Sequence, residues 1–285
     1  METTHRIAEY LRQKRAAQVA PVAPTDLTST LTETRDVTTA SGTVRVVLHW
    51  PHFQAATGMV INLHGGGFIY PHTDRDTLFC KQLCLAANVL VCDILYPLAP
   101  EHPFPAPLQA CYEVVQALQD RYQQQLGWPT LLGHGAGGNL AVGTQILAQR
   151  RGQPVAQHLL LVNPLLDLST APEDKISPTG VWTSGTVDLT QDFTDFYLPG
   201  GAHQNILLSP SAATPADLVN FPPTFILSAD RDPLCAEAET FAQHLVATGT
   251  RVTTRRYQQS PHGFLVDHTG AYKQAFHDIS HQLKV

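Results

Sequence analysis

Residues 133–139 of the chain read Gly133-His134-Gly135-Ala136-Gly137-Gly138-Asn139. The stretch follows a short apolar run at 129–132 (PTLL) and precedes the small and apolar residues of 139–149 (NLAVGTQILAQ). Such a run is typical of a buried parallel strand, and the glycines allow a tight turn into a helix packed closely on that strand. The frame is that of the GxSxG nucleophile elbow, in which a serine is raised above the sheet on a strand-to-helix turn. In this chain a glycine occupies the serine's place, so the turn carries no nucleophile.

A second glycine-rich stretch lies upstream, where His64-Gly65-Gly66-Gly67-Phe68 follows the apolar run at 59–63 (MVINL). Glycines at the end of such a strand expose backbone N–H groups to a concave site, and those donors can hold a carbonyl oxygen or an oxyanion. A loop whose glycines only provide backbone flexibility would have the same sequence pattern. The stretch therefore indicates an oxyanion-binding loop only in combination with the other motifs of the chain.

The partners lie downstream. Residues 225–230 (FILSAD) read as a further strand that leads into Arg231-Asp232-Pro233-Leu234, and Ser260-Pro261-His262-Gly263-Phe264 precedes the last predicted helix. An acid after a late strand and a histidine in a loop near the end complete the chain order nucleophile, acid, histidine. The acid and the histidine are present, and the nucleophile is absent.

With these motifs and the Pro-rich stretch at 96–108 (YPLAPEHPFPAPL), the chain resembles the hormone-sensitive-lipase-like family of α/β-hydrolase esterases. The blocks run in family order and cover most of residues 43–283. The resemblance implies that Asp232 is the acid that orients a histidine and that His262 is the general base. It also implies that Gly65, Gly66 and Ala136 supply the backbone donors of an oxyanion hole, with Gly135 at the nucleophile position. The chain departs from the family pattern at His134, where an aspartate is usual, and at Cys235-Ala236, where Arg-Asp is common.

The alternation of segments predicts the fold class. Strands are expected at 43–50, 58–63, 89–95, 129–133, 157–163, 223–229 and 251–257, and helices at 4–19, 75–87, 107–126, 136–150, 234–248 and 270–283. Strands alternating with helices indicate a mostly parallel central sheet covered by helices on both faces, here the α/β-hydrolase fold. Residues 19–34 are predicted as a polar, Pro-containing connection. We expect one domain over 1–285, with small cap elements at 1–25 and 167–215, the latter rich in Pro, Gly and aromatic residues.

Composition narrows the function classes. The formal net charge is −6, and the single short basic run at 12–15 does not make the basic patch that a nucleic-acid surface needs. No stretch has the length and apolarity of a membrane span or a signal peptide, so we expect a cytoplasmic protein. The five cysteines imply no disulfide framework. Fourteen histidines invite a metal hypothesis, but His134 should point off the turn rather than toward His262, so we expect no metal site and no cofactor.

Three functions remain open from the sequence. The first is an esterase-like or lipase-like protein that is inactive or weak in acyl-enzyme ester hydrolysis and binds a small ester or hydrophobic acid in a retained pocket. The second is a non-covalent acid/base enzyme that uses the Asp232–His262 dyad for proton transfer. The third is an active short-acyl carboxylesterase whose serine was replaced by engineering. Homo-oligomerisation stays open.

Overall fold

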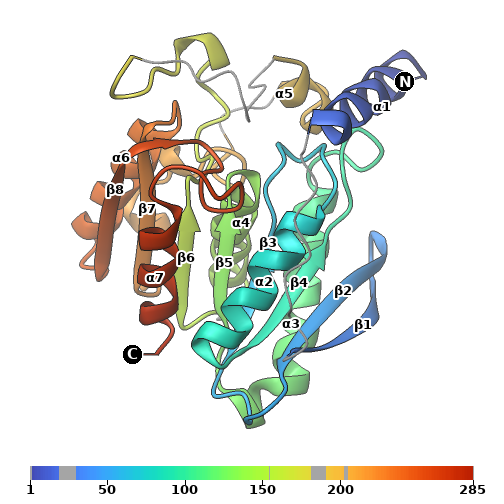
Figure 1. Cartoon of the computed structure of the whole chain (residues 1–285). Coiled ribbons are helices and arrows are strands. Elements are labelled where there is room, and N and C mark those ends of the chain that lie inside the picture. Colours follow the sequence, from blue (N-terminus) through green and yellow to red (C-terminus); the bar gives the residue numbers. More distant parts are fainter. Residues whose placement is uncertain (1, 19–29, 154, 181–190, 202–204, 285) are drawn as a thin grey trace.

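The computed structural model of the chain describes residues 2–18, 30–153, 155–180, 191–201 and 205–284 (Figure 1). Its centre is an eight-stranded sheet in the order β1-β2-β4-β3-β5-β6-β7-β8. Strand β2 is antiparallel to both β1 and β4, and every other neighbouring pair is parallel. The strands are β1 (Thr30–Thr39), β2 (Gly42–Pro51), β3 (Met59–Leu63), β4 (Leu90–Leu95), β5 (Thr130–His134), β6 (His158–Val162), β7 (Thr224–Arg231) and β8 (Val252–Pro261).

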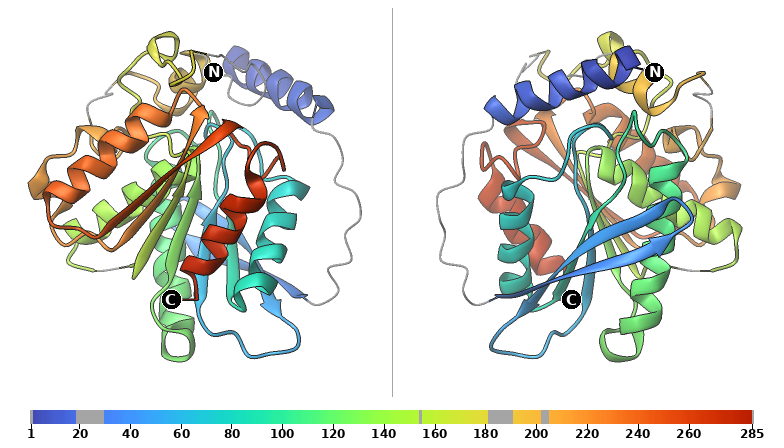
Figure 2. Two further views of the ribbon diagram at one scale, coloured as in Figure 1. Left: turned by 60° about the vertical axis from the view of Figure 1, so that its left-hand side comes forward. Right: turned by 90° about the vertical axis from the view of Figure 1, so that its right-hand side faces the viewer.

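Helices cover both faces of this sheet, as the sequence predicts (Figure 2). Helices α2 and α7 pack on one face, whereas α3, α4 and α6 pack on the other. The helices of the described residues are α1 (Glu2–Gln18), α2 (Asp74–Ala87), α3 (Ala106–Leu126), α4 (Ala136–Arg150), α5 (Gln191–Tyr197), α6 (Cys235–Ala247) and α7 (Tyr272–Gln282). None of them is long and apolar enough to cross a membrane.

The apolar runs form buried strands because their side chains pack into two hydrophobic cores, one on each face of the sheet. In β3, Met59, Ile61 and Leu63 enter the core beneath α3 and α4, while Val60 enters the core beneath α2 and α7. Successive side chains of a strand point to opposite faces, so a central strand between two helical layers must be apolar on both. This explains why the residues of β3 are apolar on both faces instead of alternating with exposed polar ones, with the exception of Asn62, which is buried and donates to Asp93 Oδ1 at 2.8 Å.

Two elements differ from the prediction. The connection predicted at 19–34 ends early, because residues from Thr30 onward form β1, which pairs along its whole length with β2 from Thr30↔Pro51 to Thr39↔Gly42. This edge strand is largely solvent-exposed and rich in threonine, so it has β propensity without the apolar pattern of a core strand. The short helix α5 was not predicted either.

The segments predicted as cap elements lie beyond the carboxyl ends of the parallel strands (Figure 1). Helix α1 and the segment that carries α5 are on this side of the sheet. Residues 19–25 of the first predicted cap element, and 181–190 and 202–204 of the second, lie outside the described residues. The function of these segments as a cap stays a prediction.

Candidate active site

The glycine-rich turn joins β5 to α4 at the carboxyl edge of the sheet. Gly135 separates the two elements with φ 51° and ψ −113°, a backbone conformation that strains any residue with a side chain. Its N–H donates to Val162 O at 3.0 Å, and its carbonyl oxygen accepts from the N–H groups of Leu165, Gly138 and Asn139 at 3.0, 3.0 and 3.3 Å. The turn is therefore fixed entirely by backbone hydrogen bonds.

The neighbouring glycines allow α4 to approach the sheet closely. A Cβ atom at Gly137 would lie 2.0 Å from Leu63 O, and one at Gly133 would lie 2.3 Å from Gly137 O. At Gly138 a Cβ atom would lie 2.7 Å from Pro164 Cβ. Because two of these obstacles are backbone atoms that cannot swing away, the glycine spacing is a steric requirement of this strand-to-helix packing.

Asp232 and His262 come from the ends of the last two strands and meet beside the turn. His262 Nδ1 lies 2.9 Å from Asp232 Oδ2. The carboxylate is fully buried, and it also accepts hydrogen bonds from the Asn163 side-chain amide and, at 2.9 Å, from the Leu234 N–H. A histidine oriented in this way by a carboxylate presents its other ring nitrogen to the site.

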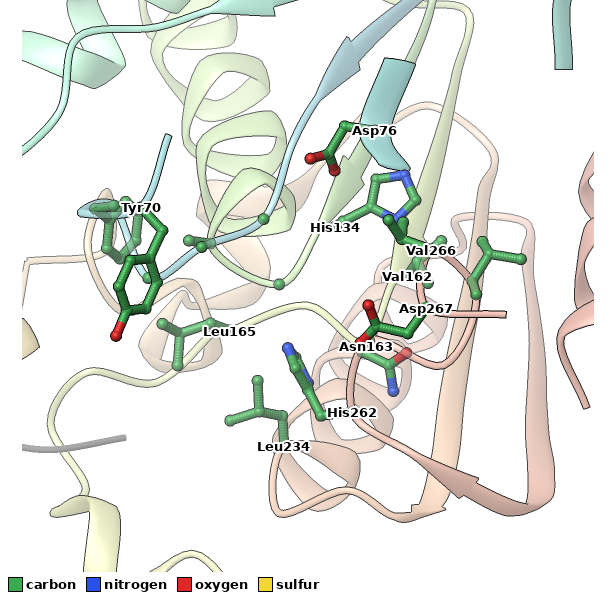
Figure 3. A pocket seen from close by; sticks show the side chains of 18 of the residues that line it. Tyr70, Asp76, His134, Val162, Asn163, Leu165, Leu234, His262, Val266 and Asp267 are labelled. Atoms are coloured by element: carbon green, nitrogen blue, oxygen red, sulfur yellow. The ribbon is translucent and has the colours of Figure 1, made fainter. Parts of the chain in front are cut away.

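That other nitrogen faces the turn (Figure 3). A Cβ atom at Gly135 would lie 3.2 Å from His262 Nε2 and 3.4 Å from its Cε1. The Asp232–His262 contact expected from the sequence is thus present, and the ring is directed at the position where a residue other than glycine would carry its side chain.

The loop after β3 closes the other side of the turn. Gly66 and Gly67 have positive φ angles of 115° and 59°, and a Cβ atom at Gly66 would lie 2.9 Å from Tyr70 O. Gly65 packs against the turn, since its Cβ atom would lie 3.3 Å from His134 O. Within the described parts of the chain, no protein acceptor bonds the backbone N–H groups of Gly65, Gly66 or Ala136, and all three residues line the pocket above the turn.

The pocket has an apolar wall and a charged rim. Its apolar lining comes from Phe68, Tyr70, Val162, Leu165, Leu168, Leu234, Leu265 and Val266. At the rim, Arg75 Nη1 lies 2.9 Å from Asp267 Oδ1, and the Arg15 guanidinium from α1 stacks over the Tyr70 ring at 4.5 Å. The floor is therefore polar through backbone groups and His262, and the walls suit an apolar ligand group.

A family model described as the alpha/beta hydrolase fold matches residues 60–266. The chain belongs to this family.

Curated relatives of this α/β hydrolase carry esterase names. Esterase LipI of Mycobacterium tuberculosis is 27% identical over an alignment of 247 residues that covers 79% of this chain and 72% of that protein. An arylesterase of Saccharolobus solfataricus is 26% identical over 271 residues, covering 90% of this chain and 84% of the relative.

Solved structures agree on the fold. A hyperthermophilic esterase of Pyrobaculum calidifontis superposes with a TM-score of 0.82 at 27% identity, over 99% of this chain and 90% of that one. A thermostable esterase of Pseudomonas putida superposes with a TM-score of 0.86 at 23% identity, over 97% and 89% of the two chains. The second similarity is one of fold alone. The predicted fold class is confirmed.

His134 does not approach His262 in this α/β hydrolase. Its side chain is buried, packs edge-on against the Phe79 ring at 4.8 Å between ring centroids, and points toward Asp76 rather than toward His262 (Figure 3). Burial lowers the pKa of His134 to about 4, so the ring is neutral near pH 7. Its Nε2 has no hydrogen-bond partner among the residues that the structure describes.

A second histidine–carboxylate pair, not predicted from the sequence, lies behind the glycine loop. His72 Nε2 is 2.6 Å from Asp93 Oδ2, and Asn62 Nδ2 donates to Asp93 Oδ1 at 2.8 Å. Burial raises the pKa of Asp93 and lowers that of His72, but the bond and the attraction between the two outweigh burial, so the pKa of Asp93 is lowered and that of His72 is raised. An aspartate inside the apolar run LVCDIL was the available sequence signal.

Among the described residues, one group of three side chains has metal-ligating atoms within 4.8 Å of one another: His49, Cys80 and Asp93, all buried. It includes neither His134 nor His262. Asp93 in that group already accepts hydrogen bonds from His72 and Asn62. These hydrogen bonds explain how the carboxylate can be buried without a bound ion.

Proposed function

We propose that this α/β hydrolase is an esterase-like protein that cannot form an acyl-enzyme and retains a pocket for a small ester or hydrophobic acid. In this proposal Asp232 and His262 are the acid and the base of the site. Gly65, Gly66 and Ala136 are the oxyanion-hole donors. Gly135 occupies the position of the missing serine. The observation that carries the proposal is the position of His262, whose Nε2 would lie 3.2 Å from a Cβ atom at Gly135, where the side chain of a serine would begin.

The acyl-enzyme route needs an oxygen or sulfur nucleophile beside the base, and the nearest serine in sequence does not supply one. Ser260 is fully buried outside the pocket lining, where its hydroxyl donates to Gln258 O and accepts from the Ala271 N–H, both at 3.0 Å. Thr144 is fully buried within α4. The esterase names of the relatives support an ester or its acid as the ligand class.

Labelling and binding test the proposal together. The wild-type chain should show no burst with p-nitrophenyl butanoate and no mass increase with a fluorophosphonate, whereas ethyl butanoate or butanoate should shift the His262 imidazole resonances in NMR spectra. A burst together with covalent labelling would show that a nucleophile exists elsewhere. If neither ligand shifts the His262 resonances, the proposal that the protein retains a binding pocket for these ligands is wrong.

A second candidate, a non-covalent acid/base enzyme, is favoured by the Asp232–His262 contact at 2.9 Å beside unbonded backbone donors. Such a site can remove a proton from water or from a carbon acid while the donors hold the developing oxyanion or enolate. Turnover that disappears in His262→Ala, without covalent labelling of the wild type, is the expected result. Equal rates in both proteins would exclude this candidate.

We also propose that 1–285 form one domain whose segments 1–25 and 167–215 cap the pocket. The support for the first segment is the Arg12 side chain, which donates to Ile69 O at 3.0 Å, to Ala99 O at 2.8 Å and to both carboxylate oxygens of Glu101 at 2.8 Å. For the second, Lys175 and Thr194 line the pocket. Deletion of residues 1–18 should speed ligand entry and exit if α1 is a cap, and should leave both rates unchanged if it is not.

A further inference from the structure

We propose that the floor of the pocket is a carboxylate subsite, and that the preferred ligand is a deprotonated monocarboxylic acid with an apolar tail. This inference rests on the pocket of the proposed function and narrows its ligand class from esters and acids to the acid anion.

The first step is the number of donors that converge on the turn. Gly65, Gly66 and Ala136, whose N–H groups bond no acceptor among the described residues, line the pocket from two segments. His262 lines it from a third, and its Nε2 would lie 3.2 Å from a Cβ atom at Gly135. In a serine enzyme the hydroxyl lies between His262 and these donors. A glycine leaves that path open, so an oxygen in contact with the Gly135 Cα can accept a hydrogen bond from Nε2 when this nitrogen carries a proton in addition to Nδ1.

The second step is the match with two oxygens. A carboxylate can place one oxygen on the backbone donors and the other toward the imidazole, and both of its oxygens are strong acceptors. An ester offers a carbonyl oxygen to the backbone donors but only a weakly accepting, uncharged alkoxy oxygen to His262. A primary amide would direct either an N–H or a single oxygen there. Of these three groups, the carboxylate is the one that offers a strong acceptor oxygen both to the backbone donors and to the His262 imidazole.

The third step is charge. Helix α4 begins at Ala136 and runs for 15 residues, so its N-terminal end favours an anion at the floor. The carboxylates that line the pocket are already engaged: Asp267 with Arg75, Asp76 with the Thr73 backbone and hydroxyl, and Asp167 with the hydroxyls of Ser169 and Thr170. Asp232 is bonded to His262, Asn163 and the Leu234 N–H. Arg75 offsets the charge of Asp267, and the hydrogen bonds direct oxygens of the other three carboxylates toward protein donors rather than toward the ligand.

The fourth step is the wall. Leu165 and Leu234 stand next to His262, and the Tyr70 ring faces them across the pocket (Figure 3). These side chains offer apolar surface directly above the polar floor, which suits an aliphatic or aryl tail attached to the carboxylate.

Isothermal titration of the full chain tests the inference with sodium hexanoate, hexanamide and methyl hexanoate. Hexanoate should bind roughly tenfold or more tightly than the amide and the ester, because hydrogen bonds to a charged acceptor are about twice as strong as neutral ones. Equal or tighter binding of the amide or the ester would overturn the carboxylate subsite and leave the pocket of the proposed function intact. Binding of none of the three would overturn both.

Two variants locate the subsite. Gly135→Ala places a methyl group 3.2 Å from His262 Nε2 and should weaken hexanoate binding at least about tenfold. His262→Gln removes the imidazole while keeping a polar side chain, and should abolish the preference for acid over amide. This second variant tests the subsite even if Gly135→Ala does not fold. The matched control is Gly152→Ala, a positive-φ glycine (65°) whose Cβ atom would meet no other atom within 4 Å, and its hexanoate affinity should equal that of the wild type. Wild-type affinity in Gly135→Ala, or an unchanged acid preference in His262→Gln, would refute the subsite.

Discussion

Restoring a serine at the turn tests the candidate site as a whole. The substitution Gly135→Ser adds a Cβ atom 3.2 Å from His262 Nε2, a contact slightly too tight for a relaxed ring. If His262 retreats by a few tenths of an ångström, the new hydroxyl can hydrogen-bond Nε2. In the proposed site, Asp232 orients His262 and the N–H groups of Gly65, Gly66 and Ala136 are the supporting donors that a serine hydrolase requires.

The backbone sets the stability change. A non-glycine residue at φ 51° and ψ −113° lies in a sparsely populated region that costs about 1–3 kcal/mol. In a chain of this size, each kcal/mol lowers the melting temperature by about 2–4 °C. Because the strain depends on the Cβ atom and not on the hydroxyl, Gly135→Ala should be destabilised by a similar amount and serves as the matched control.

The hydroxyl should be visible in covalent chemistry. Gly135→Ser should gain fluorophosphonate labelling and a burst with p-nitrophenyl butanoate, with kcat/KM rising about 10²-fold or more, because general-base activation of a nucleophile contributes about 10²–10⁴-fold. Gly135→Ala and the double variant Gly135→Ser/His262→Ala should show neither. A folded Gly135→Ser protein without labelling, or one whose labelling is unaffected by His262→Ala, would refute the assignment of the base and its donors.

Three further substitutions test the packing around the pocket. His72→Gln should destabilise the protein by about 3–5 kcal/mol near pH 5–6, as expected when one partner of a buried ion pair is removed. Because the pKa of His72 is raised in the folded protein, the ion pair contributes its full stability below the unfolded pKa of 6.5 and loses it as the pH rises through the folded pKa. Chemical denaturation at pH 9 should therefore show a smaller stability difference between His72→Gln and the wild type. An equal loss of stability at both pH values contradicts the pairing with Asp93. Gly137→Ala should fail to fold or should lower the free energy of unfolding by more than about 4 kcal/mol. In the control Gly58→Ala the new Cβ atom lies 3.7 Å from the nearest side chain, so its melting temperature should be close to that of the wild type. A stable Gly137→Ala protein contradicts the packing of α4. Arg12→Gln should increase protease cleavage within α1 without changing the melting of the sheet core, and unchanged cleavage would show that Arg12 does not anchor α1.

The sequence was most informative where the backbone itself is constrained. The glycines at 133 and 137 are dictated by contacts of a Cβ atom with backbone atoms, so their spacing predicts the packing of α4 on the strand directly. The buried runs of β3 and β5 were equally predictable, since both faces of a central strand must be apolar. The expected partnership of Asp232 with His262 followed from chain order and the resemblance rather than from any local pattern.

Other features could not be derived locally. Strand β1 is held by its partner β2 at the sheet edge and exposes most of its side chains, so no apolar periodicity marks it. The His72–Asp93 pair joins a loop to a strand 21 residues later, and only the packed structure shows that the two side chains meet. The roles of Asp232, His262 and Gly135 stay predictions that the substitutions above address.

The four backbone hydrogen bonds of Gly135 also bear on the kinetics of ligand exchange. The amides of Gly135 and Leu165 are hydrogen-bonded to backbone acceptors where β5 and β6 end, beneath the pocket, so their hydrogen exchange requires a large cooperative opening. Helix α1, by contrast, is held by the hydrogen bonds of Arg12, by Arg15 over the Tyr70 ring and by the packing of Ala8 and Leu11 on the core, and it can detach by a local fluctuation. Ligand residence time should therefore be controlled by opening at the N-terminal helix, while the floor keeps one geometry whether the pocket is filled or not.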